Sequence, residues 1–154
     1  MNDVRVRQAG PDDVLEIAGM CAALWPEGSE EEHAGEVRQY IETGRYGTLP
    51  AVFLLAQDGA GTVTGFLHVS MRSHADGCDP EQPVGFIEGW FVKPEVRGQG
   101  LGAILMHTAE NWAREHGCRE LASDTWMDHL PSQQAHQALG FEIVDRCVHF
   151  RKSL

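Results

Sequence analysis

The sequence predicts a single mixed α/β (α+β) domain in which helices cover both faces of a mostly antiparallel central sheet. In the first two thirds of the chain, β-rich runs are joined by a hairpin-like turn, whereas in the last third helical and strand-like segments alternate. The length of 154 residues suffices to bury one core but is too short for two ordinary domains. One domain over residues 1–154 is therefore expected, with the element order βααβββαβαββ.

The amino-terminal part is expected to contain one strand and two helices. Residues 4–7 alternate apolar and polar side chains, and Gly10-Pro11 ends this strand. Apolar residues at helical spacing from Val14 to Leu24 predict the first helix. After a break at Trp25-Pro26, the acidic segment 27–36 leads into a second helix that ends near Gly44.

The middle of the chain is expected to supply three strands. Residues 51–56 and 63–71 are β-rich and are separated by Asp58-Gly59-Ala60-Gly61, which predicts an antiparallel hairpin. A further strand is expected over residues 84–92. The polar loop 72–83 between them is rich in Gly, Asp and Pro, which is typical of a mobile or ligand-shaped segment.

The last third is expected to contain a long helix, a strand, a short helix and a closing pair of strands. Apolar residues fall on one helical face at Leu101, Ile104, Leu105, Ala109, Trp112 and Ala113. Gly117 provides the stop. Residues 120–125 are expected to form a strand and 132–139 a helix, and the final strands are expected from Gly140-Phe141 to near Lys152.

Charge and cysteine usage restrict the possible partners. A net charge of -11 repels nucleic acid and anionic lipid and favours a cationic small molecule, although an acidic balance can also serve solubility alone. The 4 cysteines form no CxxC pair, and the amino terminus lacks an apolar signal sequence. We therefore expect a cytoplasmic protein with reduced thiols, no transmembrane span, and no metal site, since the histidines form no HxxxH pair.

The most informative segment is the glycine-rich turn 97–102, which joins the strand ending at Val92 to the long helix. Glycines let backbone N–H groups close on an anion, and a helix start adds partial positive charge, so a pyrophosphate is the expected guest. A tight turn without ligand remains an alternative. A P-loop is excluded because no GK[ST] follows. Gly98-x-Gly100-x-x-Ala103 with Asp124 matches a dinucleotide fingerprint, but four expected strands precede it and too little chain follows.

The same segment resembles the acetyl-CoA motif of the GCN5-related N-acetyltransferase (GNAT) superfamily. That motif is a strand followed by Gln or Arg, two residues, Gly, one residue, and Gly or Ala, which Arg97-Gly98-Gln99-Gly100-Leu101-Gly102 fits. Gly140-Phe141 after a short helix is similar to the superfamily's usual close. The resemblance implies a GNAT-type mixed sheet and acetyl-CoA as co-substrate. It implies cofactor contacts at Trp90, Phe91, Val92, Arg97, Gly98, Gln99, Gly100, Leu101, Gly102, Ala103 and, in the loop before the short helix, His129.

Within this superfamily, segments along the whole chain resemble the aminoglycoside 6′-N-acetyltransferases. They are Leu24-Trp25-Pro26, Asp76-Gly77-Cys78-Asp79, Phe86-Ile87-Glu88-Gly89, Ala122-Ser123-Asp124-Thr125 and His136-Gln137-Ala138-Leu139-Gly140-Phe141. The resemblance implies an aminoglycoside pocket made by Trp25, Glu88, Asp124 and Asp145. Carboxylates suit ammonium groups and an indole suits a sugar ring. In Ser73-His74-Ala75 an aromatic contact of these relatives is missing, which leaves the aminoglycoside spectrum open.

The expected reaction is direct attack of an amine on the acetyl thioester. The resemblance assigns the Val92 N–H to the thioester carbonyl oxygen. Glu88 or Asp124 is expected to remove the amine proton. His136 occupies the position of the superfamily's general-acid tyrosine, so it either protonates the leaving thiolate or serves binding and packing. The apolar terminal segment around Cys147, Val148 and Phe150 suggests a homodimer.

Two other functions remain open at this stage. The first is the same chemistry on another amine, such as a polyamine, a peptide N-terminus or a small metabolite, since the superfamily fixes the donor better than the acceptor. The second is a non-catalytic acyl-CoA-binding module, against which the acidic trio Glu88, Asp124 and Asp145 argues.

Overall fold

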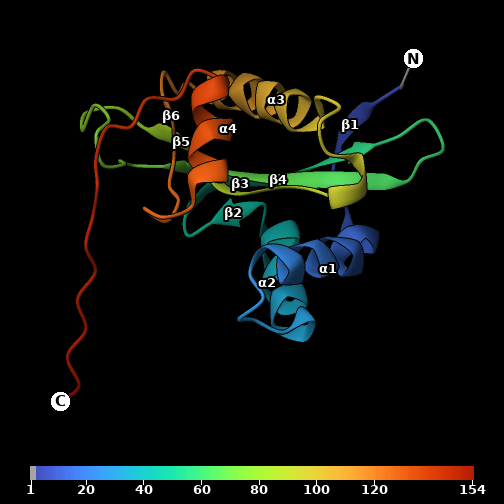
Figure 1. Ribbon diagram of the computed structural model, residues 1–154, viewed down its shortest axis with the longest axis horizontal. Coiled ribbons are helices and arrows are strands. Elements are labelled where there is room, and N and C mark those ends of the chain that lie inside the picture. Colours follow the sequence, from blue (N-terminus) through green and yellow to red (C-terminus); the bar gives the residue numbers. More distant parts are fainter. Residues whose placement is uncertain (1–2) are drawn as a thin grey trace.

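The computed structural model describes residues 3–154 as a sheet between two layers of helices (Figure 1). The elements in order are β1 (Arg5–Gln8), a 3-10 turn (Pro11–Asp13), α1 (Val14–Leu24), α2 (Glu30–Thr43), β2 (Arg45–Tyr46), β3 (Leu49–Gln57), β4 (Val63–Arg72), β5 (Val84–Val92), a 3-10 turn (Pro94–Val96), α3 (Leu101–Glu115), β6 (Leu121–Ser123) and α4 (Leu130–Ala138). The predicted order is confirmed up to α4, apart from β2, which is too short to leave a periodic pattern in the sequence.

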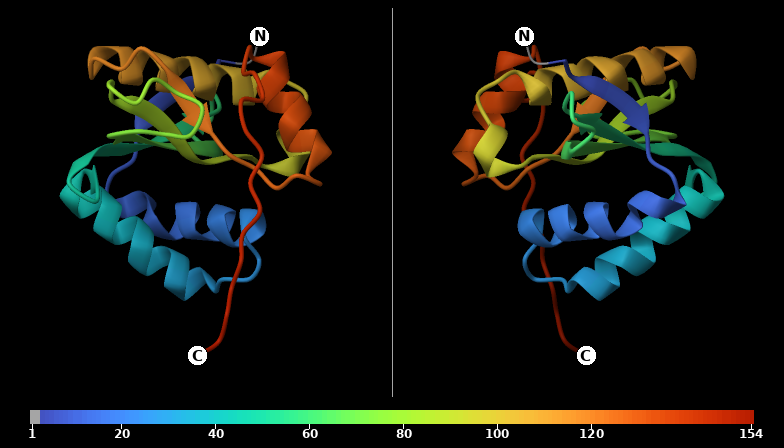
Figure 2. Two further views of the ribbon diagram at one scale, coloured as in Figure 1. Left: turned by 90° about the vertical axis from the view of Figure 1, so that its left-hand side faces the viewer. Right: turned by 90° about the vertical axis from the view of Figure 1, so that its right-hand side faces the viewer.

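The sheet is mixed and mostly antiparallel, as predicted. Its strands lie in the order β1-β3-β4-β5-β6, and β2 pairs with β3 beside this path. Every pair is antiparallel except β5 with β6, which is parallel. The side views in Figure 2 show α1 and α2 on one face of the sheet and α3 and α4 on the other. We call these the α1/α2 face and the α3/α4 face.

Local interactions fix the two ends of α2. The Ser29 hydroxyl caps α2 by accepting the Glu32 N–H at 3.1 Å, and three glutamates in the first turn suit the positive end of the helix dipole. Gly44 ends α2 at φ 63, a left-handed conformation that glycine adopts without strain.

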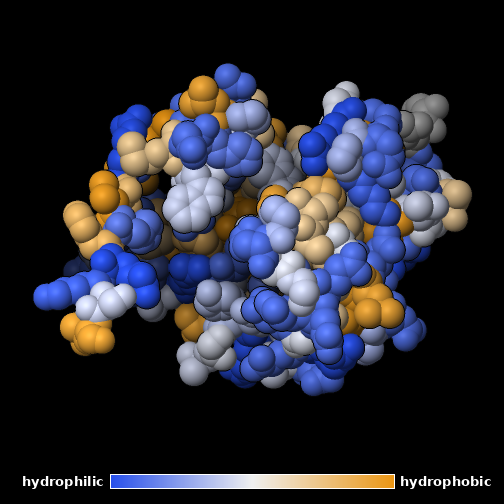
Figure 3. Space-filling model, turned by 60° about the horizontal axis from the view of Figure 1, so that its bottom comes forward, coloured by the Kyte–Doolittle hydropathy of each residue, from blue (hydrophilic) through white to orange (hydrophobic). Residues whose placement is uncertain are grey.

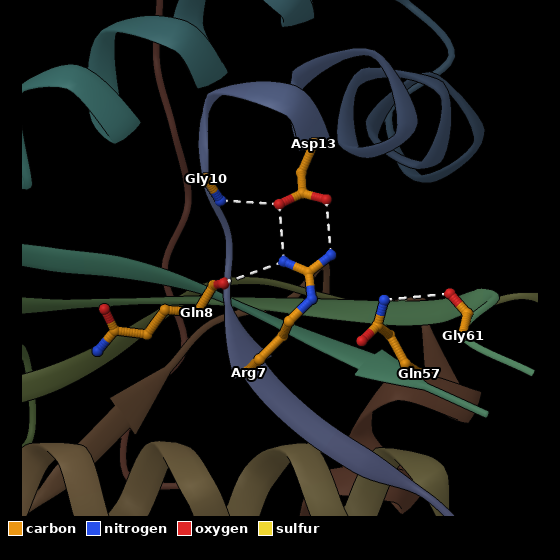
Figure 4. Close-up of polar contacts among 6 residues, drawn as sticks. All are labelled: Arg7, Gln8, Gly10, Asp13, Gln57 and Gly61. Carbon is orange, nitrogen blue, oxygen red and sulfur yellow. Dashed lines mark hydrogen bonds and ion pairs between the residues drawn. The ribbon is translucent and has the colours of Figure 1, made fainter. Parts of the chain in front are cut away.

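An ion pair fixes the passage from β1 into α1. The Arg7 guanidinium donates two hydrogen bonds of 2.8 Å to the Asp13 carboxylate, which also accepts the Gly10 N–H at 2.7 Å (Figure 4). Hydrogen bonding from Arg7 is the main reason why the pKa of Asp13 lies below its ordinary value. The pair therefore holds the start of the helical layer against the sheet.

Each face of the sheet carries its own hydrophobic core. The core under α1 and α2 contains Val14, Ile17, Ala18, Met20, Cys21, Ala34, Val37, Phe53, Leu55, Val63, Phe66 and Phe91. The core under α3 contains Leu54, Ala56, Leu67, Val69, Ile87, Leu105, Met106, Ala109, Trp112, Ala113 and Cys118. Alternation of side chains along the strands separates the two sets, so residues 53 and 55 belong to one core and 54 and 56 to the other.

The predicted closing strands from Gly140 to Lys152 are not formed. Phe141 still packs against the α3 core and Val144 lies against Gly77, but residues 141–154 contain no strand in the described chain, and their end extends away from the domain (Figure 1). Hydrophobic groups stand exposed at that side of the molecule (Figure 3), and Ile143, Val144, Val148 and Phe150 are 45–93% exposed. The reason is that a strand needs a partner, and three-residue β6 offers little edge to pair with.

Residues 3–154 show neither a membrane-spanning helix nor a metal-binding cluster. None of the helices there combines the length and apolar character required to cross a bilayer. No group of three or more His, Cys, Asp and Glu side chains in the same range is placed to hold a metal ion.

Candidate active site

The central feature of the site is a fork between β5 and β6. The two strands pair over only three positions, the last being Ile87 opposite Ser123, although β5 continues to Val92. Glu88 and Asp124 are the first residues beyond this last pair. Ile87 packs into the core under α3, so its neighbour Glu88 points to the α1/α2 face. The sequence therefore brings one carboxylate to each arm of the fork.

A β-bulge directs Glu88. In the β4–β5 ladder His68 pairs with Gly89 and Val69 pairs with Ile87, which leaves Glu88 as the extra residue. Bulges of this kind bend a strand and redirect a side chain. The adjacent Gly89 is needed for packing, because a Cβ there would lie 2.7 Å from the Trp25 indole. Trp25 is thus held over the strand, and it lines the same cavity as Glu88.

Glu88 is fully engaged in ion-pair and hydrogen-bond contacts. Its Oε1 accepts hydrogen bonds from the Ser70 hydroxyl at 2.6 Å and from Arg72 Nε at 2.9 Å, and its Oε2 accepts one from Arg72 Nη2 at 2.7 Å. The Arg72 guanidinium carbon lies 3.6 Å from the centre of the Phe86 ring. The carboxylate is only 11% exposed, so this is a half-buried, two-pronged ion pair.

A cavity of about 180 Å³ opens on the same face beside Glu88. It is lined by Cys21, Trp25, His33, Glu36, Val37, Tyr40, Tyr46, Phe53, Phe66, His68 and Glu88. Burial lowers the pKa of His68 to about 3, and burial with the charge of Glu36 raises the pKa of Cys21 to about 12. Both side chains are therefore neutral near pH 7, and the carboxylates set the charge of the cavity.

On the α3/α4 face, His136 sits at the fork in a hydrogen-bond network. Its Nδ1 lies 2.7 Å from the Ser132 carbonyl oxygen, which can only accept, so Nδ1 carries a proton. Its Nε2 lies 2.8 Å from the Ser123 hydroxyl. The rings of Trp90 and Phe141 flank the imidazole edge-on, with ring centres 5.2 Å away in each case. Hydrogen bonds and ring contacts thus fix the position of His136 at the fork.

The predicted anion turn lies at the end of β5. Gly98 and Gly100 adopt φ 78 and 81, and no atom lies within 4 Å of a Cβ built on either, so the turn is open. Ile104 donates the first hydrogen bond of α3 to the Gly100 carbonyl, which leaves the N–H groups of residues 101–103 directed outward. The turn has the features of a phosphate cradle.

The remaining predicted cofactor residues surround this turn. Trp90 Nε1 donates to the Gly102 carbonyl at 3.2 Å, and Leu101 is buried. Arg97 Nε donates to the Val92 carbonyl at 2.8 Å. The Lys93 N–H bonds to β4 at Thr64, so alternation directs the Val92 N–H to the opposite edge, where the fork is open. Phe91 lies in the other core, and Gln99 and Ala103 belong to the turn and the first turn of α3.

Two predicted residues lie apart from this group. His129 is exposed just before α4, where its N–H bonds to the Trp126 carbonyl. Asp145 is exposed on the extended segment and accepts the N–H of Arg146. Within a single chain, Asp145 does not join Trp25, Glu88 and Asp124, because the strand expected to carry it is absent.

Three residues of the site were missed from the sequence. Ser70 and Arg72 alternate on β4 and so share a face, and Ser123 precedes Asp124. The Ser-x-Arg spacing was visible, but its meaning depends on the β4–β5 register and on the bulge at Glu88.

Comparison with known proteins agrees with this geometry. The sequence profile described as the Acetyltransferase (GNAT) family matches residues 16–141. A relative from Klebsiella aerogenes, named aminoglycoside N(6′)-acetyltransferase type 1, is 39% identical over 149 residues, which is 97% of this chain and 96% of the relative.

Solved structures give the same result. The structure of AAC(6′)-Iy with the bisubstrate analogue CoA-S-monomethyl-acetylneamine has a TM-score of 0.86 and 32% identity, covering 98% of this chain and 99% of that chain. AAC(6′)-Ih from Acinetobacter baumannii, described as an aminoglycoside antibiotic 6′-N-acetyltransferase, has a TM-score of 0.87 and 32% identity, with 98% and 99% covered. The chain therefore belongs to the acetyltransferase (GNAT) family.

Proposed function

We propose that this protein is an aminoglycoside 6′-N-acetyltransferase, which moves the acetyl group of acetyl-CoA to an amino group of an aminoglycoside and so confers resistance. The observation that carries the proposal is the fork. It has an open glycine turn for a diphosphate on one side, and Trp25, Glu88 and an acid-lined cavity on the other. The relatives named above act on this class of antibiotic according to their names.

The residues of the turn suit coenzyme A. The open positions at Gly98 and Gly100 and the outward N–H groups of residues 101–103 suit its diphosphate. When bound, acetyl-CoA supplies the acetyl group as a reactive thioester. The Val92 N–H, at the open edge of β5, is the donor that we assign to the acetyl carbonyl oxygen, where it stabilises negative charge. His129 remains a further proposed contact.

The acceptor amine is proposed to bind on the α1/α2 face. Trp25 packs against the sugar ring, while Glu88 and Asp124 attract its ammonium groups. The amine must lose a proton before it attacks. Both oxygens of Glu88 already accept hydrogen bonds, whereas Asp124 is exposed and accepts none from residues 3–154. We therefore assign binding to Glu88 and proton removal to Asp124.

The active form is proposed to be a homodimer. The exposed apolar residues of the segment 141–154 need a partner strand, and the same segment of a second copy of the chain can supply one. Exchange of this segment would also bring Asp145 to the other subunit's pocket. Sedimentation should show a dimer at micromolar concentration and a monomer for Phe150→Asp; a monomeric wild type would contradict the proposal.

The charge and composition of the chain bear on its cellular location and its partners. We propose a single domain that works in the cytoplasm, with neither nucleic acid nor membrane as partner, because a net charge of -11 repels both.

The direct test is thiol release from acetyl-CoA with kanamycin or tobramycin, compared with spermidine and a short peptide. The expected result is fast release with the aminoglycosides only. Release with spermidine or the peptide alone would indicate another acceptor. Binding of coenzyme A by calorimetry with no thiol release from any amine would indicate a non-catalytic module.

A further inference from the structure

Arg72 places a permanent positive charge inside a site that otherwise suits cations. Its guanidinium forms the two-pronged pair with Glu88 and packs on Phe86 at 3.6 Å, with the Tyr46 ring 5.2 Å away. The Arg72 side chain is one-third exposed, while its partner carboxylate is nearly covered. The carboxylate that is proposed to attract a substrate ammonium is therefore already paired with the protein's own cation.

Arg72 is protonated at any working pH, as arginine is in proteins generally. Partial burial alone would lower its pKa, but hydrogen bonding to Glu88 and the charges of Glu88, Tyr46 and Asp124 raise it above the ordinary value. Asp124 is thus close enough for its charge to act on Arg72. The Arg72 guanidinium therefore offsets the negative charge of Glu88 and part of the negative charge of Asp124, the two carboxylates beyond the fork.

Other titratable groups surround the pair. From the elements packed around it these are Cys21 on α1, His33, Glu36 and Tyr40 on α2, Tyr46 on β2 and His68 on β4. Burial keeps the Cys21 thiol and the His68 imidazole neutral between pH 6 and 9, and burial also raises the pKa of Tyr40. These buried groups therefore do not offset the charge of the carboxylates, whereas Arg72 does.

A site for a reactive ammonium has two conflicting requirements. Carboxylates bind the ammonium, yet they also raise its pKa and so reduce the fraction of neutral amine that can attack. Nearby positive charge weakens the binding of the ammonium and lowers its pKa.

We propose that Arg72 is a positioning residue that resolves this conflict, because it neutralises Glu88 and thereby keeps the bound acceptor amine easy to deprotonate, at the expense of acceptor affinity. This inference rests on the proposed function, because it concerns the acceptor side of the same site. It assigns no contact with the thioester to Arg72.

The test changes the charge at position 72 and measures KM and the pH dependence of kcat for each variant. Arg72→Met keeps a long apolar side chain over Phe86 and removes the charge. KM for tobramycin should fall about three- to tenfold, kcat at pH 7 should also fall, and the alkaline rise of kcat should move up by about one pH unit or more. A lost proton acceptor or simple damage would not lower KM.

Two further variants serve as matched controls. The double variant Arg72→Met with Glu88→Gln removes one charge of each sign, so the rise of kcat with pH should return close to its wild-type position. Arg72→Lys keeps the charge but loses the two-pronged geometry, so its pH profile should stay near that of the wild type. Coenzyme A affinity and Tm confirm folding, and Arg72→Gln replaces Arg72→Met if the latter does not fold.

The outcomes separate this inference from the proposed function. A wild type that acetylates tobramycin, together with an unshifted pH profile or a raised KM in Arg72→Met, overturns the role of Arg72 alone. If the wild type acetylates only another amine of the panel, the aminoglycoside assignment falls and the same series is read with that amine. A wild type that acetylates none of them overturns both.

Discussion

The two faces of the fork are built from different kinds of interaction. On the α1/α2 face, Glu88, Arg72 and Asp124 form a charged group beside an aromatic cavity. On the α3/α4 face, Ser123 and His136 are joined by a hydrogen bond, and the rings of Trp90 and Phe141 flank the imidazole. Under the proposed function, this difference predicts that proton transfer and recognition of a cation belong to the first face, whereas the second provides shape. Substitutions on the two faces should therefore have different effects on kcat and on its pH dependence.

The largest expected effect is that of Asp124→Asn. If Asp124 removes the amine proton, kcat should fall about 10²- to 10³-fold, because general base catalysis contributes on this scale. The exposed position of Asp124 means that stability should change little. Steady-state kinetics from pH 6 to 9 and a thermal melt measure both. An unchanged kcat and an unchanged pH profile would remove Asp124 from the mechanism.

The second prediction concerns stability on the same face, at His68. This side chain stacks on Phe53 with ring centres 4.0 Å apart, and its buried Nε2 has no hydrogen-bond partner within residues 3–154. Burial lowers its pKa to about 3 in the folded state, so between that value and the ordinary value of about 6.5 only the unfolded chain binds the proton. The free energy of unfolding should therefore decrease by about 1.4 kcal/mol for each pH unit below 6.5.

The matched variant for this effect is His68→Phe, which keeps an aromatic ring on Phe53 and cannot titrate. Urea unfolding at pH 5 and pH 8 should show a loss of about 2 kcal/mol in the wild type beyond any loss in the variant. Equal pH dependence of the two proteins would mean that His68 is not held neutral by burial.

The third prediction moves to the α3/α4 face and tests the glycine turn. Gly100→Ala places a side chain at φ 81 in the proposed diphosphate cradle, and coenzyme A affinity should fall about tenfold. Gly61→Ala, at φ 84 in the hairpin turn between β3 and β4, is the control: it carries the same backbone strain away from the site. Calorimetry that finds equal losses of affinity would assign the effect to strain rather than to binding.

Much of this arrangement could be predicted from the sequence because it depends on local patterns. Strands β3, β4 and β5 and helix α3 have strong periodicity, and the structure places them within about two residues of the expected bounds. The glycine turn was predicted from its glycines and the helix start, and the carboxylates beside the fork were predicted from a family resemblance. These features require only short-range order or a known motif.

The remainder depends on contacts between distant segments. The prediction of closing strands after Gly140 was wrong, because a strand forms only where it can pair with another, and residues 141–154 pair with no strand of the described residues. The Arg72–Glu88 pair depends on which residues of β4 and β5 face each other and on the bulge that frees Glu88. A shift of one residue in the pairing of β4 with β5 would turn the Arg72 or the Glu88 side chain to the other face of the sheet.

The smallest expected effect comes from Ser123→Ala. This change removes the hydroxyl that is hydrogen-bonded to His136 Nε2 at 2.8 Å and leaves the imidazole held by the Ser132 carbonyl. A partly buried neutral hydrogen bond contributes about 1 kcal/mol, so the free energy of unfolding should decrease by about that amount. Because the α3/α4 face supplies shape rather than protons, kcat should fall less than about tenfold and its pH dependence should not move. A displaced pH profile in Ser123→Ala, repeated in His136→Gln, would instead make this pair the source of the proton for the leaving thiolate and would give both faces of the fork a part in proton transfer.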